Sequence, residues 1–369
     1  ILKPIFFMFG VSPEATIYSF GFTLVTGVAL NFFFGVLMTM LMNAAVSKFK
    51  IFQNRKLYGE TDKKEKKQFE FVGNTKKFSI FAAACILLTV AGAFFGVEMA
   101  IEFKGGTVLT YSYEGDADFS GVNADIEAIV GSAVNVRQGE NLQSGTNAVP
   151  LEFGSLEGLS LDRQTEITDK LVEKYPDSNI EVLDTNDVSA KTGRSFLLKC
   201  LVAVVASIVF LVIYMAFRFK KIGGFSAGMF AIIALVHDCV FVFAAFLIFR
   251  YPINANFVAA ALTILGYSIN NTIVIYDRIR ENSALMPKAD FIENVNLSIN
   301  QSLKRSVRTT VTTAITMLTV SIIALLSNVE TILSFSIPLL FGLIAGTFSS
   351  LCLAPTLWAV SRSKKRTDK

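Results

Sequence analysis

The sequence predicts a polytopic α-helical membrane protein that carries one α+β domain outside the membrane. Three observations lead to this fold class. The 369 residues are 52% hydrophobic and have a mean hydropathy of +0.52, more than a soluble core needs. Seven stretches reach the length of about 20 apolar residues that crosses a hydrocarbon layer of about 30 Å. A long polar segment, residues 99–194, separates two of these stretches.

The seven predicted spans follow one another along the chain with few charges inside them. They cover residues 16–42, 78–97, 196–217, 225–249, 257–276, 307–326 and 332–360. Residues 1–9 are apolar but too short to cross a bilayer. We expect them to be the outer end of a helix whose beginning is missing, in an N-terminally truncated chain.

The distribution of charge orients the chain, because lysine and arginine next to spans are retained in the cytoplasm. Basic clusters at residues 48–77, 218–221, 278–308 and 362–369 all fall on one side if the spans alternate. Residues 99–194 fall on the other side and carry seven Lys or Arg against seventeen Asp or Glu. We therefore place residues 99–194 outside and interpret residues 48–77 as a solvated cytoplasmic linker that attracts anionic membrane lipid.

Composition argues against several classes of function. The net charge of +4 is divided between two sides of a membrane, so it does not indicate nucleic-acid binding. The four cysteines lie in four different spans without metal-ligand spacing, and neither a disulfide framework nor a metal site is expected. The single histidine, His237, also lies in a span, so no Ser/His or Cys/His pair can form outside and we do not expect an enzyme.

Two segments of the chain resemble each other. TIYSFGFTLVTG (residues 16–27) and TILSFSIPLLFG (residues 331–342) share Thr, Ile, Ser-Phe, Leu and Gly at equal spacing, and each begins a span that runs inward. Chance similarity between apolar helices is the alternative. We expect a duplicated unit, of which the first copy is almost wholly absent and the second is complete.

The outer segment alternates between strand and helix periodicity. Strands are predicted at residues 106–113, 133–138, 147–153 and 179–183, and helices at residues 121–130 and 159–175. The order β-α-β-β-α-β is that of a ferredoxin-like unit. Because the segment has no Gly-rich phosphate loop and no nucleophile constellation, a binding or lever role fits better than catalysis.

Polar side chains inside the spans are costly in hydrocarbon unless they are paired, so each is a functional hypothesis. One helical face carries Thr263, Gly266, Tyr267, Asn270 and Asn271, and a second carries Arg305, Arg308, Thr309, Thr312, Thr313 and Thr316. Both faces lie in the cytoplasmic half of the bilayer, where they could meet. The alternatives are interhelical hydrogen bonds for the stripes and snorkelling of the two arginines to the interface.

His237 and Asp238 lie near the centre of the span at residues 225–249. A mid-bilayer acid costs about 2.5 to 3.5 kcal/mol even on lenient scales. Carboxylate, imidazole, amides, hydroxyls and arginine arranged in this way could line an ion or proton path. A local Asp-His hydrogen bond that serves only packing is the other interpretation.

Four motifs resemble those of one family. GYSINNTIVIYDRIREN (residues 266–282) is similar to the signature of SecF, the second half of the SecDF protein-export factors. EFKGGT (102–107), ALVHD (234–238) and INQSLKRSVRTTVTT (299–313) follow in the family's order, so the resemblance extends over residues 78–360. The matched positions include Gly105, Gly106, Thr107, Asp277, Arg278, Arg280, Glu281 and Asn282. The copy at residues 16–42 resembles the last span of SecD.

The resemblance divides the chain into six parts. They are the last transmembrane helices of a SecD-like repeat (1–47), a cytoplasmic linker (48–77), the first SecF-like helix (78–98), an extracytoplasmic domain (99–194), a five-helix region (195–361) and a basic tail (362–369). It implies an RND-like helix bundle in a bacterial plasma membrane. It also implies an accessory role in the Sec translocase, in which an ion gradient of H+ or Na+ helps to pull exported chains outward and the outer domain moves.

The partners implied by the resemblance are the SecYEG translocon, the missing SecD half, translocating preproteins and membrane lipid, with YajC as a further candidate. Arg305 matches the family's arginine of the ion path, and Arg308 has no counterpart. Asn271 stands where the family usually has an aspartate on the proton route, and an amide cannot bind and release a proton near neutral pH.

Three explanations of Asn271 stay open. Sodium could be coupled through amide and hydroxyl oxygens, which hard cations favour, and we rank this first. The route could instead pass through Asp238 or an acid of the missing half, or coupling could be lost. The rival functions are an RND-type exporter of lipid or small molecules, which the small outer segment argues against, and a passive scaffold of the translocon.

Overall fold

The structure, a computed structural model, describes most of the chain. The described residues are 15–48, 68–115, 117–119, 121–132, 134–136, 139–141, 146–153, 160–327 and 329–367. The chain divides into two compact units, residues 1–69 and residues 70–369. The apolar stretch at residues 1–9 and most of the predicted linker lie outside the described residues.

The first unit is a single long helix over its described part. It comprises α2 (Ala15–Leu30), the π-helix η1 (Asn31–Met38) and α3 (Thr39–Val46). The apolar run therefore stays helical throughout, but eight residues in its middle change to π-helical hydrogen bonding. π-helical segments inside α-helices are uncommon and occur often at functional sites.

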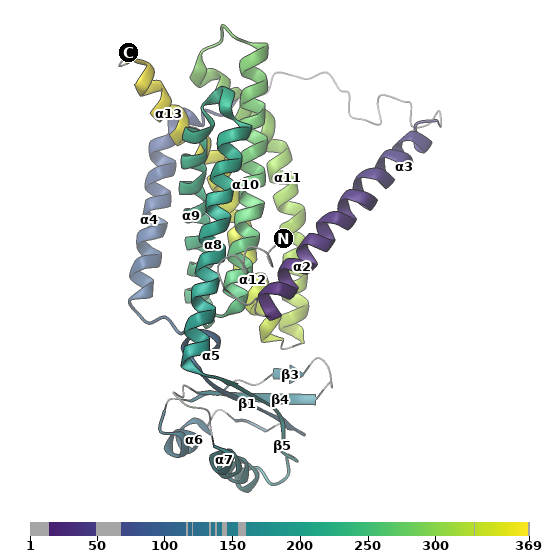
Figure 1. Cartoon of the computed structure of the whole chain (residues 1–369), viewed down its shortest axis with the longest axis vertical. Coiled ribbons are helices and arrows are strands. Elements are labelled where there is room, and N and C mark those ends of the chain that lie inside the picture. Colours follow the sequence, from purple (N-terminus) through teal and green to yellow (C-terminus); the bar gives the residue numbers. More distant parts are fainter. Residues whose placement is uncertain are drawn as a thin grey trace. The chain divides into compact units, whose positions relative to one another are not determined.

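Seven helices among the described residues are long and apolar enough to cross a membrane, which confirms the number predicted from hydropathy. Six of them belong to the second unit. They are formed by α4 (Thr75–Ala93), α8 (Ala190–Arg218), α9 (Gly224–Phe249), α10 (Ala255–Leu285), α11 (Phe291–Leu326) and α12 (Glu330–Phe348), the last continuing through η6 (Ser349–Leu353) into α13 (Ala354–Thr367). Figure 1 shows these helices side by side in one bundle.

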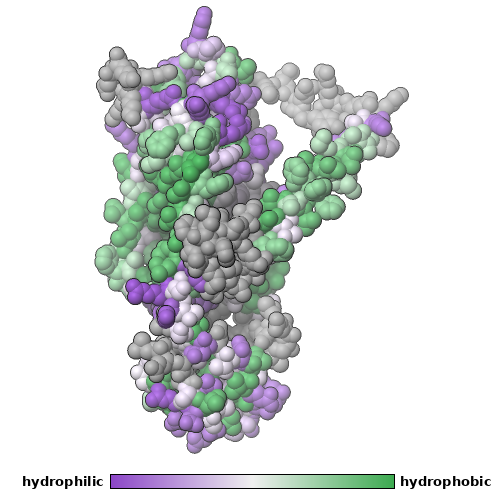
Figure 2. Space-filling view, in the orientation of Figure 1, coloured by the Kyte–Doolittle hydropathy of each residue, from purple (hydrophilic) through white to green (hydrophobic). Residues whose placement is uncertain are grey.

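The surface of the bundle has the pattern of a membrane protein. Figure 2 shows hydrophobic residues over the middle of the bundle and hydrophilic residues toward both of its ends. The centre is packed by α9, α10 and α12, and the largest fully buried side chains there include Phe219, Phe246, Tyr276 and Trp358. Polar groups placed among these helices are therefore shielded by protein.

The helices α10 and α11 extend beyond their predicted spans, toward the loop that joins them. The predicted spans end at residue 276 and begin again at residue 307, whereas the helices run to Leu285 and restart at Phe291. Asp290 caps α11, since its carboxylate accepts hydrogen bonds from the backbone N–H groups of Ile292 and Glu293. Because these helical turns carry charged residues, the hydropathy of the sequence did not assign them to the helices.

The outer segment forms a small sheet with two helices. The strands are β1 (Gly106–Tyr113), β2 (Val134–Val136), β3 (Gly139–Asn141), β4 (Thr146–Phe153) and β5 (Glu181–Val188), in the antiparallel order β2-β4-β1-β5 with β3 also paired to β4. The helices α6 (Asn123–Val130) and α7 (Leu161–Lys174) lie on one face of it (Figure 1). Leu109, Tyr111, Ile126, Ile167 and Leu171 are fully buried between these layers.

Several boundaries differ from the expectation, and the strand β3 was not predicted. Two of the differences have a visible cause. The last strand begins two residues later than predicted and runs to Val188, because Asn179 has a left-handed backbone with φ of 42° and the strand's second half is polar. The end of the predicted linker is packed rather than solvated: Phe71 and Val72 are buried, and the N–H of Val72 donates to Asn296 Oδ1 at 2.9 Å.

The junction between the sheet and the bundle is close-packed. The short helix α5 (Ile101–Lys104) precedes β1, and Phe103 packs on Phe196 of α8 with ring centroids 5.4 Å apart. A Cβ at Gly193 would lie 2.9 Å from the backbone of both Gly105 and Phe103, so only glycine fits there. Glu102 Oε2 accepts a hydrogen bond from the N–H of Ala255 at 2.8 Å and so caps the start of α10.

Candidate functional site

A buried carboxylate lies at the centre of the bundle. Asp238, near the middle of α9, has no exposed surface. Its Oδ2 accepts hydrogen bonds from the hydroxyl of Ser268 on α10 at 2.5 Å and from that of Ser349 on η6 at 2.7 Å. Its Oδ1 lies 2.9 Å from His237 Nδ1. Groups from three helices therefore converge on one acid.

Glycines on α12 allow this convergence. A Cβ at Gly342 would lie 2.5 Å from Ile264 Cγ1 and 2.8 Å from Val242 Cγ2. A Cβ at Gly346, one turn on, would lie 3.2 Å from Ser268 Cβ and 3.6 Å from Asp238 Oδ2. The G-x-x-x-G spacing thus brings α12 close to α9 and α10, as small residues do in membrane helices.

His237 is the second ionisable group of the site and is 2% exposed. While Nδ1 faces Asp238, the buried Nε2 has no hydrogen-bond partner among the described residues. The ring packs against Phe241, with centroids 4.7 Å apart, and against Phe348 at 5.9 Å. A buried polar atom without a partner is uncommon in folded proteins, and such atoms concentrate where groups exchange protons, ions or water.

The predicted face of α10 is only partly turned inward. Asn271 is buried and its Nδ2 has no partner, whereas Gly266 and Asn270 are exposed and Thr263 and Tyr267 are half-buried. The buried polar face instead carries Ser268, Asn271 and Thr272 at i, i+3 and i+4. Asn271 lies one turn beyond the serine that binds Asp238.

The predicted stripe of α11 lies on the outside of the bundle. Arg305, Arg308, Thr309, Thr312 and Thr316 are exposed, and Thr313 is half-buried. The threonine hydroxyls donate to carbonyl groups of α11 itself, as Thr309 does to Arg305 O at 3.0 Å. Neither guanidinium forms an ion pair with a described residue.

The polar contact expected between α10 and α11 exists, but mostly different residues form it. Tyr267 donates to Thr310 Oγ1 at 3.1 Å, and Thr310 Oγ1 lies 2.5 Å from Thr347 Oγ1 of α12. Thr310 is buried although both of its sequence neighbours are exposed. The two predicted faces therefore touch only at their edge, through a hydroxyl chain that the stripe did not include.

Sequence reasoning missed Ser268, Ser349, Gly346, Thr310 and Thr347. Two signals could have found some of them. The spacing of Gly342 and Gly346 marks a close helix contact, and Ser268 stands one turn before Asn271 in the same apolar helix. Only the packing of α11 against α12 distinguishes Thr310 from Thr309.

The charged end of the α10 motif connects three helices of the bundle. Asp277 Oδ1 lies 3.2 Å from Arg218 of α8 and 2.6 Å from Arg280. Arg278 donates to Gln301 Oε1 at 2.5 Å and to Glu281 at 2.6 Å, while Asn282 donates to Ser298 Oγ at 2.8 Å. These contacts describe a structural connection between α8, α10 and α11.

The glycine motif lies at the entrance to the outer sheet. Gly105 and Gly106 have φ of 84° and 149°, which a side chain would strain, and they connect α5 to β1. The hydroxyl of Thr107 donates to Asp187 Oδ1 of β5 at 2.8 Å. The motif therefore fixes how the first and last strands of the sheet leave the bundle.

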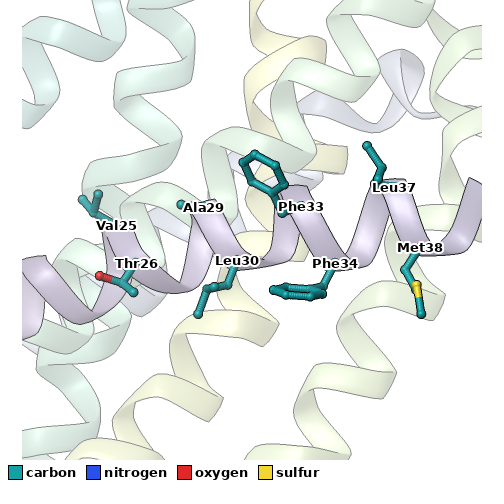
Figure 3. Close-up of a pocket in the computed structure, with 8 residues that line it drawn as sticks. All are labelled: Val25, Thr26, Ala29, Leu30, Phe33, Phe34, Leu37 and Met38. Carbon is teal, nitrogen blue, oxygen red and sulfur yellow. The ribbon is translucent and has the colours of Figure 1, made fainter.

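A further hollow lies beside α2 and η1 and holds no ionisable group. Figure 3 shows its lining on a single helix, with Phe33 and Leu37 on one side of the ribbon and Leu30, Phe34 and Met38 on the other. Among the described residues, no group of three or more His, Cys, Asp or Glu side chains could hold a metal ion. The buried chemistry of the described chain thus centres on Asp238.

Comparison with known families assigns this architecture. The family described as "Protein export membrane protein SecD/SecF, C-terminal" matches residues 167–364, more than half of the chain and all of the helices around Asp238. The chain belongs to this SecD/SecF family. The matched region includes the motifs of α9, α10 and α11 and most of the outer domain's second half.

Curated relatives carry the name protein translocase subunit SecF. The chain is 30% identical to the one from Calditerrivibrio nitroreducens, covering 82% of this chain and 97% of the relative, and 31% identical to that of Rickettsia bellii, covering 80% and 94%. With seven apolar helices and such relatives, this family member is a multi-pass protein of the bacterial inner membrane.

Solved structures of SecDF have the same fold. The crystal structure of SecDF from Thermus thermophilus, a translocon-associated membrane protein, aligns with a TM-score of 0.67 and 26% identity, covering 81% of this chain. SecDF in its super-membrane-facing form aligns with a TM-score of 0.58 and 25% identity, covering 82%. This chain spans 39% of the first SecDF chain and 40% of the second.

Proposed function

We propose that this SecD/SecF family member is an accessory subunit of the Sec protein translocase, which uses an ion gradient to promote late steps of protein export. Its family, its SecF relatives and its multi-pass architecture support the subunit role. The observation that carries the ion-gradient part is Asp238, a fully buried acid held by groups from three membrane helices. Its partners would be the SecYEG translocon, a SecD half, YajC and the translocating preprotein.

We place the coupling ion, a proton or a sodium ion, at Asp238 rather than at Asn271. The amide of Asn271 cannot titrate, and it carries no negative charge to balance a bound cation. Asp238 combines a carboxylate with two hydroxyl oxygens, which are ligands that hard cations prefer, and with an imidazole that can exchange a proton. This arrangement favours the second of the three explanations for Asn271.

The first unit is proposed to be the last span of a SecD-like repeat. The aligned segments begin at Thr16 and Thr331, and each leads into a π-helix. Met38 follows Thr16 by as many residues as Leu353 follows Thr331. The two π-helices therefore end at corresponding positions of the two aligned segments. Chance similarity of apolar residues does not predict a shared departure from α-helical geometry.

The outer domain is proposed to be a ferredoxin-like lever. Two observations support this proposal. The antiparallel strand order is β5-β1-β4-β2, with α6 following β1 and α7 following β4 along the chain, and the glycine motif lies where the domain leaves the bundle. The cap that Glu102 provides for α10 joins the base of this domain to the helix that carries Ser268. Movement of the domain and of α10 would then be coupled.

The proposal is tested by export that is driven without ATP. The chain, its SecD half and the translocon are placed in vesicles, a secretory chain is arrested part-way, and its completion is followed under an imposed sodium or proton gradient. We expect completion under one of these gradients. Asp238→Asn should reduce the rate by at least tenfold, in line with the loss of a group to which the ion binds directly.

Matched variants make the result specific. Ser350→Ala changes a buried serine beside Ser349 that donates to Thr347 O instead of to Asp238, and it should keep the rate. Completion that is equally fast without either gradient, or with Asp238→Asn, would reject ion coupling here and favour a passive scaffold. An RND-type exporter predicts that completion does not depend on this chain at all.

A further inference from the structure

A second pocket lies at the outer ends of α4 and α9, away from Asp238. It has a volume of about 420 Å³, within the range of ligand sites. Its lining combines apolar groups with two opposite charges, Glu98 and Arg250. The complete lining is Gly92, Phe95, Gly96, Val97, Glu98, Phe246, Leu247, Ile248, Arg250 and Tyr251.

The two charges face one pocket but do not pair. Both side chains are exposed, and neither forms a hydrogen bond or an ion pair with any residue that the structure describes. An exposed ion pair contributes little to stability, so both charges stay available to a ligand. The separation leaves room for a ligand that carries charges of both signs.

Arg250 is held in an unusual position. It ends α9 with a left-handed backbone at φ of 53°. This conformation is energetically unfavourable for a residue as large as arginine, and glycine or asparagine would adopt it more easily. It also lies on the outer side of the membrane, where arginine is disfavoured by the bias that orients such proteins. A strained cation on the unfavoured side suggests a specific role.

The backbone around the pocket is fixed in advance. Ile253 donates its N–H to Glu98 O at 2.8 Å, and Ala100 donates to Ile253 O at 3.0 Å, so the connectors after α4 and α9 are paired. Glu98 and Arg250 therefore belong to one rigid rim. A site that is formed before its ligand arrives loses less entropy on binding.

The surroundings are those of a membrane interface. Phe94 and Phe95 are 87% and 93% exposed, Ile248 is 65% exposed, and Phe249 stacks on Tyr251. Aromatic side chains gather at the level of lipid headgroups, and aliphatic ones face the acyl chains. A ligand here would thus meet apolar surface on one side and the two charges on the other.

We propose that this pocket binds an outer-leaflet phospholipid with a zwitterionic, primary-amine headgroup. Its phosphate lies at the Arg250 guanidinium, its ammonium group lies at the Glu98 carboxylate, and an acyl chain follows the groove beside Gly92. An anionic headgroup would satisfy Arg250 but be repelled by Glu98, whereas a zwitterion matches both. Such a lipid would occupy the rim from which the outer domain leaves the membrane.

The test measures which lipid the whole protein retains. Protein in nanodiscs of equal parts phosphatidylethanolamine and phosphatidylglycerol is released into the gas phase, and native mass spectrometry counts the lipids that stay bound. We expect phosphatidylethanolamine to be retained preferentially. Arg250→Gln and Glu98→Gln should each lower that retention about tenfold, the effect of losing one charge-assisted hydrogen bond.

Two further variants separate the pocket from general charge attraction. Gly92→Leu fills the groove without changing charge and should also lower retention, whereas Arg194→Gln removes an exposed outer arginine elsewhere and should not. Thermal melting verifies that each variant is folded. Equal retention of both lipids, or wild-type retention by folded Arg250→Gln or Glu98→Gln, would overturn the proposal.

Discussion

The faces of α10 and α11 look alike in sequence but have opposite environments in the structure. Both helices place polar residues three and four positions apart in apolar runs. On α10 Ser268, Asn271 and Thr272 are buried, and Ser268 donates to Asp238. On α11 the predicted stripe of Arg305, Arg308, Thr309, Thr312 and Thr316 is exposed, and its threonines donate to carbonyl groups of their own helix. The spacing of polar residues therefore identifies a helix face that needs a polar partner, but it does not show whether that partner belongs to the same chain.

This difference separates two kinds of site. A face that packs inside the chain is completed by its own helices, so its effect can be measured in the isolated protein. A polar face that is exposed on a spanning helix is costly in lipid and calls for another protein or for water. The proposed SecD half would supply that surface for α11, and the following predictions test the contrast.

The largest difference should come from two glycines, one on the packed face of α12 and one on the exposed face of α10. Gly342→Ala places a Cβ 2.5 Å from Ile264 Cγ1, so α10 and α12 must move apart. We expect the folded state to lose about 1 to 3 kcal/mol, as for overpacked cores. Gly266→Ala adds a methyl where nothing lies within 4 Å and should not destabilise the isolated chain. Thermal melting in detergent compares them, and equal losses would remove the distinction between the faces.

The second prediction concerns neighbouring serines on η6. Ser349→Ala removes a hydroxyl that donates to the buried Asp238, whereas Ser350→Ala removes one that donates to a carbonyl of its own helix. Because Ser349→Ala leaves a buried carboxyl oxygen with one partner fewer, at a cost of about 1 to 3 kcal/mol, and Ser350→Ala removes a neutral bond of about 1 kcal/mol, Ser349→Ala should destabilise more. Denaturation of both variants in the same detergent checks the order, and the reverse order would contradict the contribution of Ser349 at Asp238.

Neighbouring threonines on α11 provide a smaller contrast. Thr310→Val breaks the contacts with Tyr267 and Thr347 and should cost about 0.6 kcal/mol per interhelical hydrogen bond. Thr309→Val affects only a bond to its own helix and should change stability by less than about 0.5 kcal/mol. When a SecD half is bound, Thr309→Val should lower stability by more than it does in the isolated chain. If the SecD half makes no difference to this variant, the exposed stripe of α11 is not an interface.

Much of the fold could be predicted from sequence because it follows from local patterns. Apolar runs defined the seven spans, and alternation defined β1 from Gly106 to Tyr113 without error. The sequence did not predict two polar extensions, the turns of α10 beyond residue 276 and the second half of β5. Both are stabilised by contacts with distant residues, such as Asn294 for α10 and Thr107 for β5. Patterns of hydropathy do not report such contacts.

The candidate site could be predicted only in part. His237 and Asp238 stand out as ionisable residues in a span, and the structure brings them together. Ser268 and Ser349 lie in separate helices that meet only because Gly342 and Gly346 permit it. Arg305 and Thr309 fit the same periodic rule as the buried residues, so the sequence offers no local reason to assign them to the opposite side.

The smallest effect is expected in the outer domain, far from either face. The Lys174 ammonium, hydrogen-bonded to Asp125 at 2.6 Å, lowers the pKa of that carboxyl below its usual value of about 3.9. The pair therefore stabilises α6 against α7 at neutral pH, and this contribution is lost as pH falls through the lowered pKa. The protection factors of the amides of α6 and α7, which correct exchange for its intrinsic pH dependence, should fall at acidic pH in the wild type but less in Asp125→Asn. Indifference to pH in both would contradict the contribution.

The central claim, that the coupling ion binds at Asp238, is tested most directly by infrared difference spectroscopy of the membrane-embedded protein. Spectra are recorded after a pH jump and after addition of sodium, for the wild type and for Asp238→Asn. The account predicts a carboxyl band that responds to protons or sodium in the wild type and disappears in Asp238→Asn, while Asn271→Ala keeps it. A carboxyl response that survives in Asp238→Asn, or no response to either ion, would contradict it.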